Sequence, residues 1–378
     1  MSLNGVLSVI SGHPEYLRHM ATAPTPEAPP RVAVRQGARP GYIAALWRHQ
    51  PGPLLVITPR SEDARRLHDQ LLTYLGEGEQ VYLLPEPEVL PFERLSVDAN
   101  TSNQRLAALA ALASSSANRD SEDSSHPLVV ASVGAVLIKT LPFEVMVGPG
   151  AGGGESGLWR VGVGEKVRLN QLLAHWVDLG YRNEPVVEAP GCFSHRGGII
   201  DVYPAHADLP YRIELWDDEI DTIRQFDPYS QRSVRGVEEV RLIPAREQLP
   251  NLTSPVRVRE LVSGIDFTRC NKDIQERMEE EIAALFTGPN IETISFYNGL
   301  LNSANLLEYL PKHGRIVLER ASQIEAEALE LQERFDRMRS NREDRGELPR
   351  LSDPIPALAG VRRGAGAASP VAAPDLGQ

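Results

Sequence analysis

Apolar residues in the first third of the chain alternate between short continuous runs and helical spacing. The runs, which are typical of strands buried in a parallel sheet, are 54–59, 81–85 and 127–133. The segment 61–75, after the first run, repeats leucine every fourth residue, and we expect Ser61 to cap this helix and Gly76 to end it. Strand and helix alternate in this way along the region, which predicts a parallel α/β domain over residues 1–150.

Two low-complexity stretches interrupt this pattern. Residues 114–126 are mostly Ser, Asn, Asp and Glu, so we expect a solvated loop inside the domain. Residues 149–157 are rich in glycine, so we expect a flexible connector and the first domain boundary there.

Beyond the connector, an amphipathic helix is followed by several strand signals in quick succession. The helix is expected at 169–181, with Gly180 near its end. The strand signals are HRGGIIDVYP, YRIELW, EIDTIRQFD and VEEVRLIP. This pattern predicts a small α+β domain with a mainly antiparallel sheet over residues 159–248.

Helical spacing returns after residue 250. One face of the next helix is expected to carry Ile274, Met278, Ile282 and Leu285. A strand at 314–319 followed by another helix would complete the sheet begun before residue 150, which would make the middle domain an insertion between 1–150 and 250–345. Residues 346–378 are rich in Pro, Gly and Ala without periodicity, and we expect a disordered tail.

Composition narrows the class of protein. The net charge of −12 and pI of 5.3 argue against a protein that binds duplex DNA mainly by neutralising phosphates. Cys192 and Cys270 are far apart and form no CxxC pair, so neither a disulfide scaffold nor a metal site is expected. No apolar run is long enough to span a bilayer, and the first residues do not resemble a signal peptide. We therefore expect a cytoplasmic protein that has no contact with a membrane.

Parallel α/β domains often bind nucleotides through a phosphate-binding loop. Residues 32–47 contain Gly37 and Gly41, but no Gly-Lys-Ser/Thr follows, and Arg39 precedes a proline where backbone donors are needed. The acidic run 217–221 is interpreted as a solvated turn rather than a cation site. We expect no catalytic residue, no metal and no cofactor, although a divergent nucleotide-dependent enzyme is the alternative.

The strand YRIELW offers a surface instead. Strand alternation turns Tyr211, Ile213 and Leu215 to one side and Arg212, Glu214 and Trp216 to the other. Arg196 enters a neighbouring strand, and an exposed tryptophan flanked by arginines is typical of protein-binding hot spots. The alternative is that Trp216 packs beneath the amphipathic helix while the arginines pair with residues 217–221, and the sequence leaves both possibilities open.

Three long segments of this sequence resemble a known family. They are EPEVLPFERLSVDANTSNQRLAALAAL, LVVASVGAVLIKTLP and HRGGIIDVYPAHADLPYRIELWDDEIDTIRQFDPYSQRS. The first two are similar to the N-terminal part of the bacterial transcription-repair coupling factors (the Mfd family), and the third to the UvrB-interaction domain shared by Mfd and UvrB. This resemblance, over residues 40–340, implies a P-loop-NTPase-like (UvrB-like) α/β domain that lacks the phosphate-binding motif and carries the inserted domain.

The same resemblance implies a function. In the family the inserted domain docks onto UvrA, and the contact residues correspond to Arg196, Arg212 and Trp216. UvrB is the close alternative, but it has a complete phosphate-binding loop and an aromatic hairpin that probes DNA, where this chain has only Phe92.

Two other expectations concern what the chain lacks. RNA-polymerase binding, DNA translocation and ATP use belong to domains that the family carries beyond the resemblance. We expect a truncated or frameshifted product, with a stand-alone adaptor or a remnant without function as alternatives.

Overall fold

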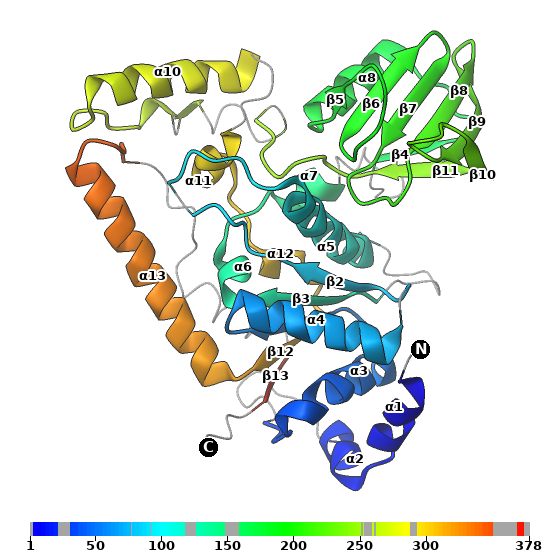
Figure 1. The fold of residues 1–378 in the computed structure, drawn as a ribbon, viewed down its shortest axis with the longest axis vertical. Helices are drawn as coiled ribbons and strands as arrows, with labels where there is room; N and C mark the ends of the chain where they lie inside the picture. The colour runs from blue at the N-terminus through cyan, green and yellow to red at the C-terminus, as the bar shows by residue number, and fades with distance from the viewer. Residues whose placement is uncertain are drawn as a thin grey trace.

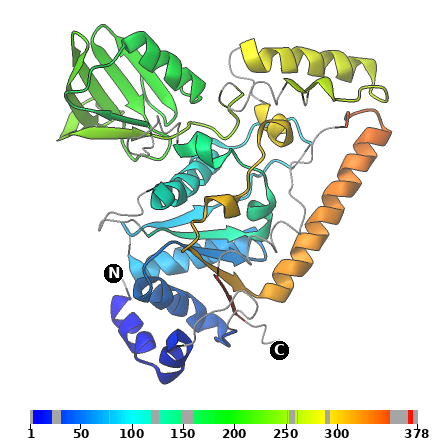
Figure 2. The same ribbon diagram turned by 180° about the vertical axis from the view of Figure 1, so that it is seen from behind.

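A computed structural model describes residues 3–21, 31–76, 78–90, 92–117, 126–147, 159–250, 252, 259–260, 262–287, 293–350 and 369–373. It has an α/β body and, beside it, a second body built around an antiparallel sheet (Figure 1). The N-terminal helices α1 (Asn4–Ser11) and α2 (Pro14–Ala21) lie at the end of the molecule away from that second body in both views (Figure 2).

The α/β body is organised by a five-stranded parallel sheet with the order β13-β12-β1-β3-β2. The strands are β1 (Leu54–Thr58), β2 (Val81–Leu84), β3 (Leu128–Ser132), β12 (Arg315–Glu319) and β13 (Ser369–Ala373). All residues of β1 are buried, because it lies at the centre of the sheet with helices on both faces. The first three strands and β12 lie where the apolar runs predict them.

Side-chain alternation divides the central strand between two hydrophobic cores. Leu54 and Val56 face the core formed with α3 (Arg39–His49) and α4 (Ser61–Leu75). Leu55 and Ile57 face the core formed with α5 (Ala99–Ala117), α6 (Val133–Leu137) and α13 (Ala321–Asp344). The short α6 begins directly after β3 because the Ser132 side chain accepts a hydrogen bond from the Ala135 amide.

Further elements lie outside the second body. They are η1 (Gln36–Ala38), α7 (Phe143–Val147), α10 (Lys272–Thr287), η2 (Ile294–Tyr297), α11 (Asn298–Leu301) and α12 (Leu306–Tyr309). Because β12 pairs with β1, residues before and after the second body belong to one sheet. The exact domain boundaries stay a prediction.

The second body contains a six-stranded sheet with the order β10-β9-β8-β7-β6-β5 and a smaller β4–β11 pair. Its elements are β4 (Trp159–Gly162), α8 (Leu169–Asp178), β5 (Arg182–Asn183), β6 (Cys192–Arg196), β7 (Ile199–Tyr203), β8 (Tyr211–Trp216), β9 (Glu219–Phe226), β10 (Ser233–Val237) and β11 (Glu239–Leu242). Strands β6 to β10 pair antiparallel, as the sequence predicts, and only β5 is parallel to its neighbour.

A buried ion pair connects the two bodies. Arg105 of α5 donates through Nη2 to Glu247 Oε2 at 3.1 Å, and Thr140 Oγ1 donates to the same oxygen at 2.6 Å. The Arg105 side chain is 1% exposed and that of Glu247 9% exposed. This buried ion pair joins the α/β body to the segment that returns from the second body.

Several local expectations are wrong. Ser61 lies inside α4, whose N-cap is Arg60 without a capping side chain. The expected loop 114–126 begins too early, because α5 continues to Ala117 with Ser114 Oγ donating to the Ala110 carbonyl within the helix. Residues 118–125 and the connector 149–157 lie outside the described residues.

Of the expected disordered tail 346–378, residues 351–368 and 374–378 lie outside the described residues, and the expectation stays a prediction there. The described parts of the tail, 346–350 and 369–373, are ordered. Leu348 is buried among the residues that pack against α10, and Arg350 bridges to Asp266. Residues 369–373 form β13, in which Val371 pairs with Val317 and Pro370 occupies an edge strand, where a missing amide is tolerated. Pairing with a distant strand is not visible in local composition. Among the described residues, no helix combines the length and hydrophobicity needed to cross a membrane.

Candidate protein-binding face

The six-stranded sheet has one covered face. Ile200, Ile213 and Ile223 lie side by side on β7, β8 and β9 and are almost completely buried. They pack in one core with Trp176 of α8, which is 1% exposed. This arrangement confirms the alternation expected for β8, in which Ile213 faces the core.

Strand register assigns the charged residues to the opposite, outer face. Arg196 of β6 pairs with Ile199 of β7, which pairs with Glu214 of β8. One step along the sheet, Asp201 of β7 pairs with Arg212 of β8. Directly paired residues point to the same side of a sheet, so Arg196 and Arg212 share the outer face.

Trp216 lies at the end of β8 and is 80% exposed. Its neighbour Leu215 packs against the core, so alternation turns Trp216 outward. The alternative that Trp216 lies beneath the amphipathic helix is wrong, because Trp176 of the helix itself fills that core.

The acidic residues after Trp216 do not form one turn. Asp217 and Asp218 lie between β8 and β9, with Asp217 at a φ of 59°, whereas Glu219 and Asp221 belong to β9. The pairing shifts from Glu214–Thr222 to Leu215–Ile220, which leaves Asp221 as an exposed extra residue in β9. The interpretation of residues 217–221 as a solvated turn therefore holds only for the first two.

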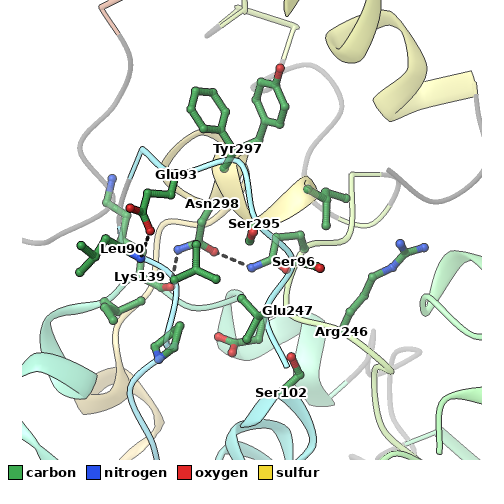
Figure 3. A pocket seen from close by; sticks show the side chains of 18 of the residues that line it. Leu90, Glu93, Ser96, Ser102, Lys139, Arg246, Glu247, Ser295, Tyr297 and Asn298 are labelled. Atoms are coloured by element: carbon green, nitrogen blue, oxygen red, sulfur yellow. Dashed lines mark hydrogen bonds between the residues drawn. The ribbon is translucent and has the colours of Figure 1, made fainter. Parts of the chain in front are cut away.

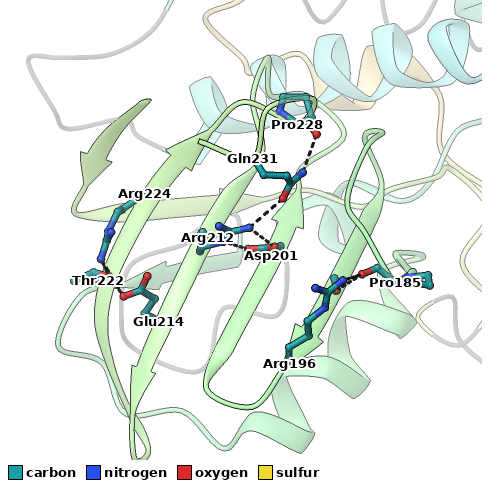
Figure 4. Close-up of polar contacts among 10 residues, drawn as sticks. Pro185, Arg196, Asp201, Arg212, Glu214, Thr222, Arg224, Pro228 and Gln231 are labelled. Atoms are coloured by element: carbon teal, nitrogen blue, oxygen red, sulfur yellow. Dashed lines mark hydrogen bonds and ion pairs between the residues drawn. The ribbon is translucent and has the colours of Figure 1, made fainter. Parts of the chain in front are cut away.

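Arg212 pairs inside the sheet rather than with residues 217–221 (Figure 4). Its Nε and Nη2 donate to the two carboxylate oxygens of Asp201 at 2.7 and 2.8 Å, and Nη2 also donates to Gln231 Oε1 at 3.2 Å. The guanidinium lies 4.6 Å from the ring centroid of Phe226. Hydrogen bonds from Arg212 to Asp201 raise the pKa of this arginine further above its usual value.

The other arginines of this face are more accessible. Arg196 donates to the Pro185 carbonyl and is exposed. Arg224 of β9 donates to Glu214 Oε2 at 2.9 Å, in a pair whose side chains are 41% and 32% exposed. Tyr229, in the connection between β9 and β10, is 91% exposed and was not expected from the sequence. Its position after Asp-Pro, where turns are common, is the signal that could have indicated it.

A second candidate site lies at the carboxyl ends of β1 and β12, where open parallel sheets usually bind ligands. A cleft of about 300 Å³ there is lined by η1, the start of α3, α4 and Glu319. Within it, Arg39 Nη1 contacts Glu319 Oε1 at 3.0 Å, with side chains 13% and 12% exposed. Arg320 Nη2 contacts Asp63 Oδ2 at 2.5 Å. The cleft is therefore lined by charges that neutralise one another.

A third site is a cavity of about 190 Å³ between residues 87–97, η2, α11 and the returning segment 246–248 (Figure 3). Its polar groups contact each other: Gln248 donates to Asn298 Oδ1 at 2.8 Å, and the Leu90 amide donates to Glu93 Oε2 at 3.1 Å. Burial and the neighbouring Arg182 lower the pKa of Arg246, which lines this cavity. The lining holds no arrangement of nucleophile and base within the described residues.

Comparison with known proteins matches one of the two bodies to a known domain. Residues 160–247, the second body, match the model of the UvrB interaction domain. Over 59% of this chain, the sequence is 37% identical to the transcription-repair-coupling factor of Myxococcus xanthus. Over 76% of this chain, it is 30% identical to the transcription-repair-coupling factor of Bacillus subtilis. The chain carries a UvrB interaction domain in a module similar to the N-terminal part of transcription-repair-coupling factors.

The matched domain contains the whole outer face, including Arg196, Arg212 and Trp216. The chain is also 35% identical to the transcription-repair-coupling factor of Mycobacterium bovis over 59% of its length. These matches confirm the family resemblance given by the sequence motifs. The aligned regions span 18%, 24% and 17% of the three relatives, so the chain corresponds to about a quarter or less of each.

Proposed function

We propose that this chain is a non-catalytic adaptor module of transcription-coupled nucleotide excision repair that docks onto UvrA. The observation that carries this proposal is Trp216, which is 80% exposed on the same side of the sheet as Arg196 and Arg212. A large aromatic ring left in water on an arginine-bearing face is typical of a binding anchor. Its place within the UvrB interaction domain favours UvrA as the partner.

The face specifies the chemistry of the partner surface. Trp216 needs an apolar hollow, and Arg196 needs a carboxylate beside it, because a guanidinium can donate two parallel hydrogen bonds to one carboxylate. Arg196 donates a hydrogen bond to the Pro185 carbonyl, and its side chain is exposed. UvrB would use the same surface of UvrA, so the chain and UvrB should compete.

The cleft at the carboxyl ends of β1 and β12 supports the non-catalytic part of the proposal. The α/β body is taken as P-loop-NTPase-like without its phosphate-binding motif, by resemblance to UvrB. The lining of the cleft, as far as the structure describes it, includes no lysine, and its arginines Arg39 and Arg66 are paired with Glu319 and Asp63. A phosphate would have to displace those carboxylates, so we propose that ATP is not a cofactor of this chain.

Contacts with RNA polymerase and DNA are assigned in this proposal to regions of the relatives that this chain does not match. The adaptor would bring UvrA to a site chosen by those regions. A nucleotide-dependent enzyme is not favoured, because the arginines in the described lining of the cleft are already paired with carboxylates.

Competition tests the proposal. The purified full chain is titrated with UvrA from the same organism by calorimetry, and the titration is repeated with UvrA saturated by UvrB. We expect a 1:1 complex with UvrA alone and loss of its heat when UvrB is present. If the folded chain does not bind UvrA, or binds equally well in the presence of UvrB, the proposed function is wrong.

A further inference from the structure

We infer that residues 227–232, which connect β9 to β10, form a second contact of the docking face, with Tyr229 as its anchor and Arg212 as its positioning residue. This inference rests on the proposed function, because it takes UvrA as the partner. It adds one aromatic residue to the predicted contact set and gives Arg212 a different role within it.

Tyr229 projects from a segment with a defined backbone. The Asp227 amide donates to the Arg232 carbonyl at 2.9 Å, and the Gln231 amide donates to the Asp227 carbonyl at 2.8 Å. The Ser230 amide also donates to Asp227 Oδ1 at 2.7 Å, and hydrogen bonds from Ser230 lower the pKa of that carboxyl. A loop already closed by hydrogen bonds loses little further freedom when its side chain binds a partner.

Exposure singles out Tyr229. It is 91% exposed, which is more than any other large apolar residue found on the described surface. Tyrosine and tryptophan are the residues most enriched among binding hot spots. No contact in the described structure explains why this ring is held in water.

Arg212 connects this loop to the sheet. Gln231, at a φ of 59°, accepts a hydrogen bond from Arg212 Nη2 and donates through Nε2 to the Pro228 carbonyl at 2.7 Å (Figure 4). The two carboxylate oxygens of Asp201 hold the Arg212 guanidinium by accepting hydrogen bonds from its Nε and Nη2. The result is a continuous chain of contacts from Asp201 through Arg212 and Gln231 to the residue before Tyr229.

The same contacts leave Arg212 little to offer a partner. A guanidinium has five N–H donors, and three are used on Asp201 and Gln231. One flat side of the group faces the Phe226 ring, and the side chain is only 24% exposed. Arg212 is therefore placed to hold the loop, whereas Arg196 and Trp216 are placed to touch the partner.

One partner surface can contact both aromatic residues. Trp216 pairs with Glu219 at the start of β9, and Tyr229 follows Phe226 at its end, so at about 3.3 Å per strand residue the two rings are separated by roughly 23 Å. A standard interface covers about 800 Å² on each partner and extends further than this. Two rings with Arg196 on the same face fit a UvrA surface with two apolar hollows and an acidic group.

Tyr229→Ser tests the anchor in the full chain. Because the ring is 91% exposed, we expect the melting temperature to stay within about one degree while UvrA binding weakens about tenfold. Leu329→Ser on α13 is the matched control, since Leu329 is 53% exposed but lies outside the matched domain. Unchanged binding by Tyr229→Ser would overturn the inference.

Asp201→Asn and Arg212→Gln test the positioning role. If Arg212 acts through the loop, both variants weaken UvrA binding by a similar factor and the double variant is no weaker than either. Hydrogen exchange at the Ser230 and Gln231 amides should accelerate in both, without UvrA present. If Arg212 contacts UvrA itself, Asp201→Asn leaves binding unchanged or tighter, and exchange in the loop does not predict affinity.

Trp216→Ala separates failure of this inference from failure of the proposed function. If Trp216→Ala weakens UvrA binding but Tyr229→Ser does not, the loop is no part of the docking face and the adaptor function stands. If neither variant changes binding, the face itself is misassigned.

Discussion

The cleft at the end of the parallel sheet and the outer face of the antiparallel sheet differ in the groups that they present to solvent. In the cleft, Arg39 and Glu319 neutralise each other with side chains 13% and 12% exposed. On the outer face, Trp216 and Tyr229 are 80% and 91% exposed. The usual ligand position of the fold is thus lined by paired charges, and the two most exposed aromatic rings of the described residues lie on the other body. The comparison indicates that the fold class alone does not locate a functional site.

The largest expected effect concerns the connection between these two regions. Arg105→Met leaves Glu247 buried without its partner, and breaking a buried pair costs about 3–5 kcal/mol. Urea denaturation should show this loss in the free energy of unfolding. Arg241→Met, which breaks an exposed pair with Glu239, should cost less than about 1 kcal/mol. Equal losses in the two variants would mean that the buried pair does not hold the bodies together.

The two tryptophans of the UvrB interaction domain should respond differently to truncation. Trp176→Ala removes a core side chain and should destabilise the protein by about 3–5 kcal/mol. Trp216→Ala removes an exposed ring and should change the stability by less than about 0.5 kcal/mol. Thermal melts of both variants measure this contrast, which disappears if Trp216 has a structural role.

Charge reversal sharpens the distinction between the two arginines. The family resemblance implies that Arg212 contacts UvrA, but the structure pairs Arg212 with Asp201, so a carboxylate at position 212 would lie against that of Asp201. We therefore expect Arg212→Glu to lower both the melting temperature and the affinity. Arg196→Glu, at an exposed position, should weaken binding at least tenfold with an unchanged melt. A stable Arg212→Glu protein would contradict the positioning role.

The smallest expected effect is that of nucleotide. Full chain with ATP and Mg²⁺ should release no phosphate above a buffer blank, with or without DNA, and ATP should leave the melting temperature unchanged. Both expectations follow from the pairing of Arg39 with Glu319 and the missing lysine. A concentration-dependent thermal shift would mean that the cleft binds nucleotide despite this pairing.

Local patterns allowed much of the fold to be predicted, because periodicity is a property of neighbouring residues. The buried strand β1, the helix α8 and the outward side of β8 all follow from spacing in the sequence. The partners of charged residues could not be predicted in this way. Arg39 and Glu319 are 280 residues apart, and Arg212 selects Asp201 across the sheet instead of the acidic residues a few positions ahead.

The same limit applies to the ends of elements and to the chain terminus. Serines at the end of α5 look like a loop in composition but continue the helix, and β13 is formed only by pairing with β12. Tyr229 was missed because a single aromatic residue in a turn has no periodic signal. Its exposure becomes visible only when the surrounding loop is folded.

The most direct test of the central claim is the affinity of Trp216→Ala for UvrA, measured by calorimetry on the full chain beside its thermal melt. Asp221→Asn is the control, because Asp221 is an exposed residue on β9. We predict that Trp216→Ala binds UvrA at least tenfold more weakly with an unchanged melting temperature, and that Asp221→Asn behaves as the parent chain. A sharply lowered melting temperature, with normal UvrA binding by the protein that remains folded, would contradict the account.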